Sequence, residues 1–243
     1  MTENTDAPKD TARMKAIFAF VACLAFAASP LVTGGFAGYA PEQFPIPQIE
    51  PPIQPAGWAF SIWGLIYLWL IASAGYGMFR KADDLGWDAT RWPLIGAAVL
   101  GAAWIPTARA DPITATIMIW AMLGFALWAY AVAPDTDRLW LRGPLGLFAG
   151  WLTAAASVSV GLVGAGYGFL SNELIAAYFG LAIALAVAAA VLLVTAPALA
   201  FGAALAWALA GITVANLGGF VGLSMASGGA AFVILILSAK SWR

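Results

Sequence analysis

The sequence of 243 residues is 63% apolar and only 9% charged, with a net charge of −1, and its mean hydropathy is +0.88. Soluble domains carry about a quarter charged residues, so this composition excludes a soluble globular domain, and the near-neutral charge gives no sign of nucleic-acid binding. The sequence has no histidine and one cysteine, Cys23, which excludes an intramolecular disulfide and a thiolate metal cluster and removes the commonest general base and metal ligand.

The N-terminal part predicts a tail, a helix and a long loop. Residues 1–13 are polar and of mixed charge and are predicted to be a short disordered cytoplasmic tail. The apolar run Met14–Thr33 predicts a membrane helix, because about 20 apolar residues cross the hydrocarbon layer; a cleaved signal peptide is the competing interpretation. Residues 34–54 are rich in proline, which predicts an extended loop outside the hydrocarbon. Loops of this length are typically lids or binding loops.

The uncharged stretch Pro55–Met78 predicts the second membrane helix and carries a stripe of aromatic residues. Trp63 and Tyr67 are four residues apart and therefore lie on one helical face. Phe60 falls one turn earlier on the same stripe. The sequence thus places several aromatic rings at the entrance of this helix.

Six further apolar runs complete the predicted all-α integral membrane protein of about eight transmembrane helices. They are Trp92–Thr107, Pro112–Val132, Pro144–Val163, Glu173–Thr195, Ala198–Leu217 and Phe220–Ala239. Asp111 is predicted to cap the fourth helix, with Pro112 as its first residue, and Ser171 or Asn172 to cap the sixth. Pro197 is expected to separate the sixth and seventh helices.

The distribution of basic residues supports this count of helices. With the N-terminus in the cytoplasm, Arg109 is the only one of the eleven basic residues that falls on the outer side. Such a bias is what the positive-inside rule predicts. We therefore expect both termini in the cytoplasm and the protein in a bacterial inner membrane.

The many tryptophans have two interpretations. Those beside the charged connectors, namely Trp87, Trp92, Trp140 and Trp242, are predicted to lie at the membrane interface. Trp63, Trp104, Trp120, Trp128 and Trp151 lie deeper. These deeper rings either pack between helices or form an aromatic cage for a flat conjugated ligand, whose faces stack well on them.

Polar residues give little indication of chemistry. The predicted helices have no ionisable group near their middle, as an ion pathway would require, and the sequence shows no carboxylate pair and no nucleophile beside a base. No catalytic residue, and no enzyme in the ordinary sense, is therefore predicted. The spacings Gly161-x-x-Gly164 and Gly218-x-x-x-Gly222 permit close helix packing, either within the bundle or in a homodimer.

Three parts of the sequence share prolines and aromatic residues with a known family. The first is Pro55-x-x-Trp58-x-Phe60 followed by Trp63-Gly-Leu-Ile-Tyr67; the second is Trp104; the third is the run from Pro144 to Thr153 that contains Phe148 and Trp151. In these parts the sequence resembles the TspO/MBR family, the tryptophan-rich sensory proteins that include the translocator protein. The resemblance covers about residues 14–165. It implies a bundle of five helices with a pocket between them, closed by the first loop, and leaves residues 166–243 as an extension of about three membrane helices.

The resemblance also implies a function and a set of site residues. Family ligands are porphyrins and other tetrapyrroles, sterol-like lipids and benzodiazepine-type drugs, so it implies a receptor or carrier with no obligatory cofactor, and in a chain without histidine it favours a metal-free porphyrin over haem. The implied ligand-binding residues are Trp58, Phe60, Trp63, Tyr67, Trp104, Phe148, Trp151 and Ser159, the last in place of the family's asparagine. The alternative is a structural accessory subunit of a larger membrane complex, in contact with lipids, pigment or partner helices.

Overall fold

The structure is a computed structural model that describes residues 7–195 and 198–240. These residues form eight α-helices, and the described ranges contain no strand. The helices are α1 (Ala7–Thr33), α2 (Ile62–Arg80), α3 (Leu85–Ala110), α4 (Pro112–Val132), α5 (Gly143–Gly166), α6 (Glu173–Val194), α7 (Leu199–Ala215) and α8 (Val221–Lys240). Two 3-10 turns, Pro41–Gln43 and Gly57–Ser61, precede α2, and a π-helical turn, Arg138–Arg142, precedes α5. The predicted all-helical class is confirmed.

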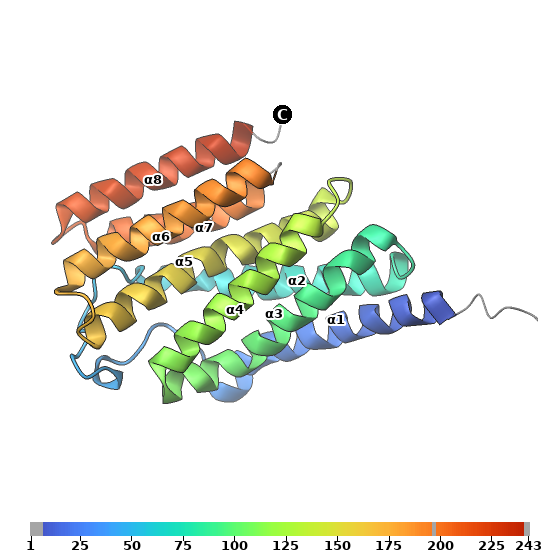
Figure 1. Cartoon of the computed structure of the whole chain (residues 1–243), viewed down its shortest axis with the longest axis horizontal. Helices are drawn as coiled ribbons and strands as arrows, with labels where there is room; N and C mark the ends of the chain where they lie inside the picture. The colour runs from blue at the N-terminus through green and yellow to red at the C-terminus, as the bar shows by residue number, and fades with distance from the viewer. Residues whose placement is uncertain (1–6, 196–197, 241–243) are drawn as a thin grey trace, which may run out of the picture.

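Six of the helical stretches are long and apolar enough to cross a membrane. α7 has 17 residues and is about 25 Å long, which is close to the lower limit for a membrane helix. α3 has 26 residues but carries Asp88 and Arg91 in its first two turns and Arg109 in its last. The chain is thus an integral membrane protein whose helices run roughly parallel to one long axis (Figure 1).

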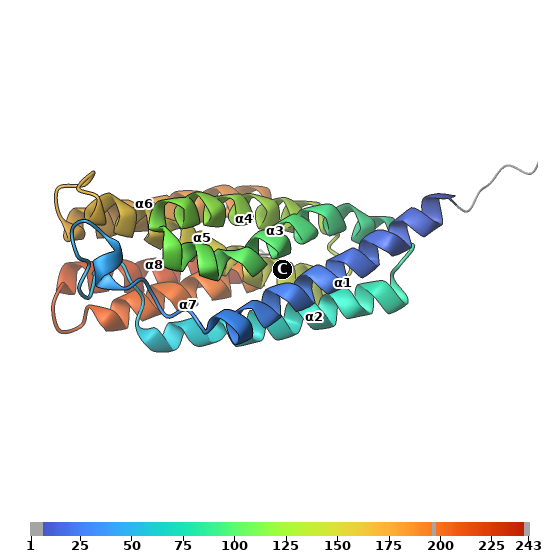
Figure 2. The ribbon, with the colours of Figure 1, turned by 90° about the horizontal axis from the view of Figure 1, so that it is seen from below.

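Helix α5 lies at the centre of the molecule and belongs to two rings of helices. In the first ring α1 packs on α2 and α3, α3 on α4, and α5 closes the ring against α4 and α2. In the second ring α5 packs on α6 and α7, and α8 closes against both. Figure 1 shows α5 between α4 and α6, and Figure 2 shows the same arrangement from below. Accordingly, 83% of the residues in an apolar 18-residue stretch of the α5 span are buried. In the other candidate membrane spans the corresponding share is 33–39%.

Side-chain caps fix the starts of three helices. The Asp111 carboxylate accepts hydrogen bonds from the backbone N–H groups of Ile113 and Thr114, and the Asn172 side chain accepts one from the Ile175 N–H at 2.8 Å, so both predicted caps are confirmed. Asp84 caps α3 in the same way. The cap at Asp84 starts α3 at Leu85. The prediction did not include this cap and therefore placed the start of the helix too late, at Trp92.

The N-terminal segment differs from the prediction. The expectation of a disordered tail is wrong for residues 7–13, which form the first turns of α1. Contacts with α3 hold this part of the helix: the Ala12 carbonyl accepts a hydrogen bond of 2.7 Å from the Arg91 guanidinium, and Lys15 forms an ion pair of 2.6 Å with Asp88. Pro197, which is expected to separate the sixth and seventh helices, lies outside the described residues. α7 begins at Leu199.

α1 begins and α8 ends at the same end of the bundle, and the α2–α3 and α4–α5 connections lie at that end as well (Figure 1). Trp87 lies here but is not an interface residue as predicted, because it is 3% exposed and its indole N–H donates to Asp137 at 2.7 Å. Lys81 also pairs with Asp137, at 3.2 Å. Arg142 bonds the Ala133 carbonyl at 2.6 Å. The two contacts of Asp137 thus join the α4–α5 connection to Lys81 and the start of α3, and the Arg142 bond closes the α4–α5 connection on itself.

Candidate ligand-binding site

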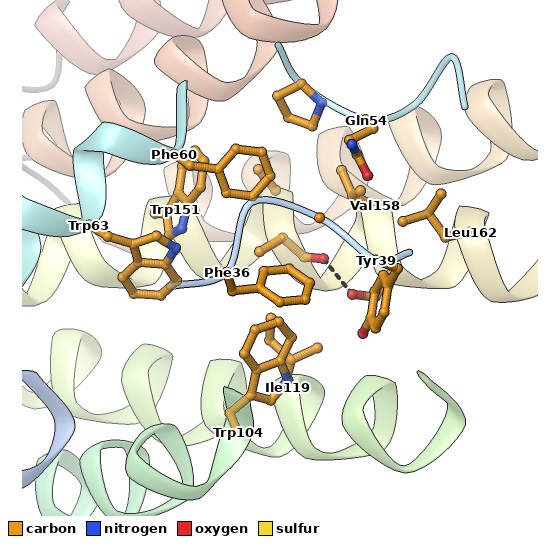
Figure 3. A pocket seen from close by; sticks show the side chains of 15 residues that line it. Phe36, Tyr39, Gln54, Phe60, Trp63, Trp104, Ile119, Trp151, Val158 and Leu162 are labelled. Carbon is orange, nitrogen blue, oxygen red and sulfur yellow. Dashed lines mark hydrogen bonds between the residues drawn. The ribbon is translucent and has the colours of Figure 1, made fainter. Parts of the chain in front are cut away.

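Two adjoining cavities lie beneath the first loop, at the end of the bundle opposite the termini. The outer cavity has a volume of about 40 Å³ and the inner one about 180 Å³. Five residues line both: Phe36, Phe60, Trp63, Trp104 and Ile119. Figure 3 shows these side chains, drawn from the first loop and from helices on both sides of it. The two cavities therefore form one site divided by aromatic rings.

The second helix supplies one wall, as the spacing of its aromatic residues predicts. The rings of Trp63 and Tyr67 are stacked, with centroids 5.4 Å apart and planes 16° apart. Phe26 of α1 packs edge-on against both rings, at 5.8 and 4.9 Å. These contacts fix the orientation of the two rings toward the inner cavity.

Helices α3 and α5 supply the facing walls. Trp104 is held in place because its indole N–H donates to the Ala115 carbonyl of α4 at 2.9 Å. Trp151 of α5 packs edge-to-face against Trp63 and Phe60, with both centroids at 5.9 Å. Helices α1, α2, α3 and α5 thus all contribute aromatic rings to the lining of the two cavities.

The first loop, residues 34–56, covers the outer cavity and is bound to three helices. The Arg109 guanidinium at the end of α3 donates to the carbonyls of residues 33–35, and the Gln43 amide donates to the Ala108 carbonyl at 2.8 Å. The Ile46 N–H donates to the Gly166 carbonyl of α5 at 2.9 Å. From α7, the Asn216 amide donates to a carbonyl of the loop, that of Pro52, at 2.8 Å. These hydrogen bonds hold the proline-rich loop in one place over the outer cavity.

A few polar groups face the outer cavity. Ser159 donates to the Ala155 carbonyl at 3.0 Å, and Gln54 lies in the roof. The Tyr39 hydroxyl lies near the hydroxyls of Ser159 and Thr116 but reaches hydrogen-bonding geometry with neither. Burial raises the pKa of Tyr39 to about 12, against a smaller opposing effect of those two hydroxyls. Tyr39 is therefore neutral at physiological pH.

Among the residues that the structure describes, no charged side chain lines either cavity. In residues 7–195 and 198–240, no three His, Cys, Asp or Glu side chains come together as metal ligands would. An apolar lining with a few hydrogen-bonding groups is typical of sites for neutral or largely apolar small molecules.

Most of the residues implied by the sequence resemblance meet at this site. Those that line a cavity are Phe60, Trp63, Tyr67, Trp104, Trp151 and Ser159. Trp58 does not: it is 44% exposed and packs edge-on against Trp207 of α7 at 4.8 Å. Phe148 does not line a cavity either. It is fully buried, and its ring packs against that of Phe26, with the ring centroids 5.5 Å apart.

Sequence reasoning missed the residues that the first loop and the first helix contribute. Phe36 and Tyr39 line the outer cavity from the loop, and Phe26 lines the inner one from α1. The only signal for the loop residues is the occurrence of aromatic residues, Phe36 and Tyr39 among them, in a segment otherwise rich in glycine and proline. Loops lack the periodicity from which the direction of a side chain can be read.

Comparison with known proteins gives one match. A family model described as TSPO-like protein matches residues 16–239, which include nearly all of the eight helices and extend well beyond the motifs in residues 14–165. No curated protein and no solved structure matches the chain.

Proposed function

The chain belongs to the family of TSPO-like proteins, and from this premise we propose that it is a membrane receptor or carrier for a flat, largely apolar molecule. The observation that carries the proposal is the convergence of aromatic rings from α1, α2, α3, α5 and the first loop on one covered space. Aromatic faces bury a large area with few rotamers to fix, so they suit a planar ligand. Ligand-binding residues are those that line the cavities, Trp63 and Trp104 foremost.

The size of the cavities bears on the choice of ligand. Sites for drug-sized molecules have volumes of about 300–1,000 Å³, and the present cavities of about 40 and 180 Å³ are smaller. A tetrapyrrole such as a metal-free porphyrin, or a sterol-like lipid, therefore requires the site to widen. A planar molecule of two or three fused rings requires less movement. In either case no obligatory cofactor is part of the proposal.

The proposed activity is binding and transfer rather than catalysis. Among the described residues, the lining carries no acid–base pair and no activated nucleophile, the groups on which acid–base and covalent catalysis depend. Membrane lipids are the surrounding partners, and a homodimer is compatible with the exposed apolar helix faces. No nucleic acid is a proposed partner.

The first prediction concerns orientation in the membrane, which we propose to be the bacterial inner membrane. Fusions of green fluorescent protein to either terminus are expected to fluoresce, and fusions of alkaline phosphatase to be inactive, because both ends carry the basic residues that remain in the cytoplasm. A phosphatase fusion after residue 220, in the α7–α8 connection, is the matched control and is expected to be active. An active phosphatase at the C-terminus would contradict an even number of spans.

The second prediction concerns Trp63. In detergent, protoporphyrin IX is expected to quench the tryptophan fluorescence of the protein at a stoichiometric ratio, and Trp63→Ala to weaken this binding about tenfold, as loss of a central aromatic contact does. Trp128→Ala is the control, since Trp128 is 54% exposed on α4 and lines neither cavity. Equal effects of the two substitutions would mean that the porphyrin does not bind at this site.

A structural role in a larger membrane complex is the second candidate function. The observation in its favour is the second ring of helices: among the described residues, α6, α7 and α8 contribute none to the lining of either cavity, and the cavity between α5, α6 and α7 has a volume of only about 10 Å³. Native mass measurement after purification in mild detergent distinguishes the candidates. Co-purification with other membrane subunits in a fixed ratio, with no response to porphyrin, would favour the structural role.

A further inference from the structure

An aromatic ring of the protein itself occupies the middle of the site. Phe36 lines both cavities. Its ring lies edge-to-face with three others, at 4.7 Å from Trp104, 5.2 Å from Tyr39 and 6.5 Å from Phe60. Figure 3 shows it between Trp63 on one side and Tyr39 on the other. The ring therefore stands at the point where a planar ligand would make its central contacts.

The segment that carries Phe36 is bound to the helices only at its start. Gly34 and Gly38, on either side of it, have φ angles of +75° and +125°, and glycine leaves such conformations at little cost. Arg109 holds the carbonyls of residues 33–35. Within the described chain, none of the amides of residues 35–39 donates a backbone hydrogen bond.

The second half of the first loop is different. Phe44 and Ile53 are wedged between helices, with exposures of 4% and 2%. The amide of Ile46 and that of Ala56 both bond helix carbonyls, the latter that of Gly211 in α7 at 3.1 Å. The loop thus has a fixed second half and, around Phe36, a first half with few contacts that resist movement.

Two buried polar groups beside the Phe36 ring have no hydrogen-bond partner. They are the Tyr39 hydroxyl and the indole N–H of Trp151, and the side chain that carries the second is 2% exposed. A buried polar group without a partner destabilises the state that contains it. Figure 3 shows Trp151 and Tyr39 on opposite sides of Phe36, so a molecule that replaced this ring could reach a donor at either side.

We propose that Phe36 is an internal occupant of the site, and that the site takes a neutral, planar molecule that displaces this ring and presents a hydrogen-bond acceptor to Trp151 or Tyr39. This inference rests on the ligand-binding function proposed above. Displacement of the ring joins the two cavities, and the absence of charged residues from both linings fits an uncharged ligand.

Occupation of the site by Phe36 is expected to lower the apparent affinity for a ligand. When the binding-competent conformation is populated only in part, the apparent dissociation constant rises in inverse proportion to that fraction. Removal of the Phe36 ring makes every molecule competent. Affinity is therefore expected to increase on Phe36→Ala, whereas loss of an ordinary contact residue decreases it.

The test uses the full chain in detergent and two probes of the same shape, 9-fluorenone and fluorene, of which the first has a carbonyl oxygen. Binding is measured by quenching of tryptophan fluorescence. We expect Phe36→Ala to bind fluorenone at least tenfold more tightly than the unaltered protein does. Phe169→Ala, at an exposed ring in the same end of the bundle, is the control for partition into detergent and is expected to leave binding unchanged. The preference for fluorenone over fluorene is expected to fall on Trp151→Phe combined with Tyr39→Phe.

Each other outcome is informative. If the unaltered protein binds fluorenone and Phe36→Ala binds it equally or more weakly, Phe36 is a contact residue and the proposal is overturned while the proposed function stands. If Phe36→Ala does not fold, the ring is part of the core and the proposal is likewise overturned. If neither protein binds fluorenone, fluorene or protoporphyrin IX, the proposed function itself fails.

Discussion

Gly150→Ala is expected to destabilise the protein strongly, by about 3 kcal/mol or more. Gly150 lies on the face of α5 that meets α7, and a β-carbon there would overlap the carbonyl oxygen of Phe201 and lie 2.9 Å from its carbonyl carbon. A backbone carbonyl within a helix cannot rotate away, so α7 would have to move as a whole. Overpacking in a well-packed core costs about 1–3 kcal/mol and sometimes more, and total stability is only about 5–15 kcal/mol.

Monodisperse yield and thermal unfolding measure this effect. Cys23 is the single cysteine and is 1% exposed, so a thiol-reactive fluorophore reports unfolding directly. Gly124→Ala is the matched control: it makes the same change in a membrane helix, at a position where a β-carbon meets nothing within 4 Å. Normal yield of Gly150→Ala would show that α5 and α7 are not packed as closely as described.

Arg91→Met is expected to lower stability by about 3 kcal/mol, the cost of removing one partner from a buried charge network. Arg91 is buried and donates to the Ala12 carbonyl at 2.7 Å and to the Lys81 carbonyl at 2.8 Å. It also forms an ion pair of 3.0 Å with Asp88. Methionine fills similar space but leaves both carbonyls and the carboxylate without these donors, so α1 is released from the start of α3.

The measurement is again the unfolding midpoint reported by Cys23, with an expected decrease of roughly 6–12 °C for a chain of this size. Arg80→Met removes the same charge at the same end of the bundle, and since Arg80 is exposed at the end of α2, the unfolding midpoint of this variant is expected to change little. This control also separates stability from any effect of charge on membrane orientation. A midpoint for Arg91→Met equal to that of Arg80→Met would contradict the described network.

The sequence was sufficient to predict the helices and part of the site. Apolar runs predicted all eight α-helices of the described residues, six of which are long and apolar enough to cross a membrane, because backbone hydrogen bonds in hydrocarbon must be satisfied within a segment. The cap at Asp111 was predictable because it depends on neighbouring residues only. The stacked pair of Trp63 and Tyr67 was predictable for the same reason, since helical periodicity alone brings these rings together.

The rest of the site depends on contacts between distant segments. Trp58 continues the aromatic stretch of the second helix, but its partner is Trp207 of α7, which no local pattern indicates. Phe148 and Trp151 lie on α5, a helix buried on nearly all sides, so it has no polar face from which the cavity side could be read. Phe36 lies in a loop without periodicity.

The position of α5 in two rings of helices has a consequence for how this chain can change. Most membrane helices have a side that faces lipid, where one apolar residue can replace another at little cost. α5 has almost no such side, and helices of both rings approach it closely at glycines, Tyr130 of α4 at Gly146 and Phe201 of α7 at Gly150. A substitution in α5 therefore needs a compensating change in a helix of one ring without disturbing the other. Related chains are expected to diverge least along this helix and most along the outer faces of α1 and α8.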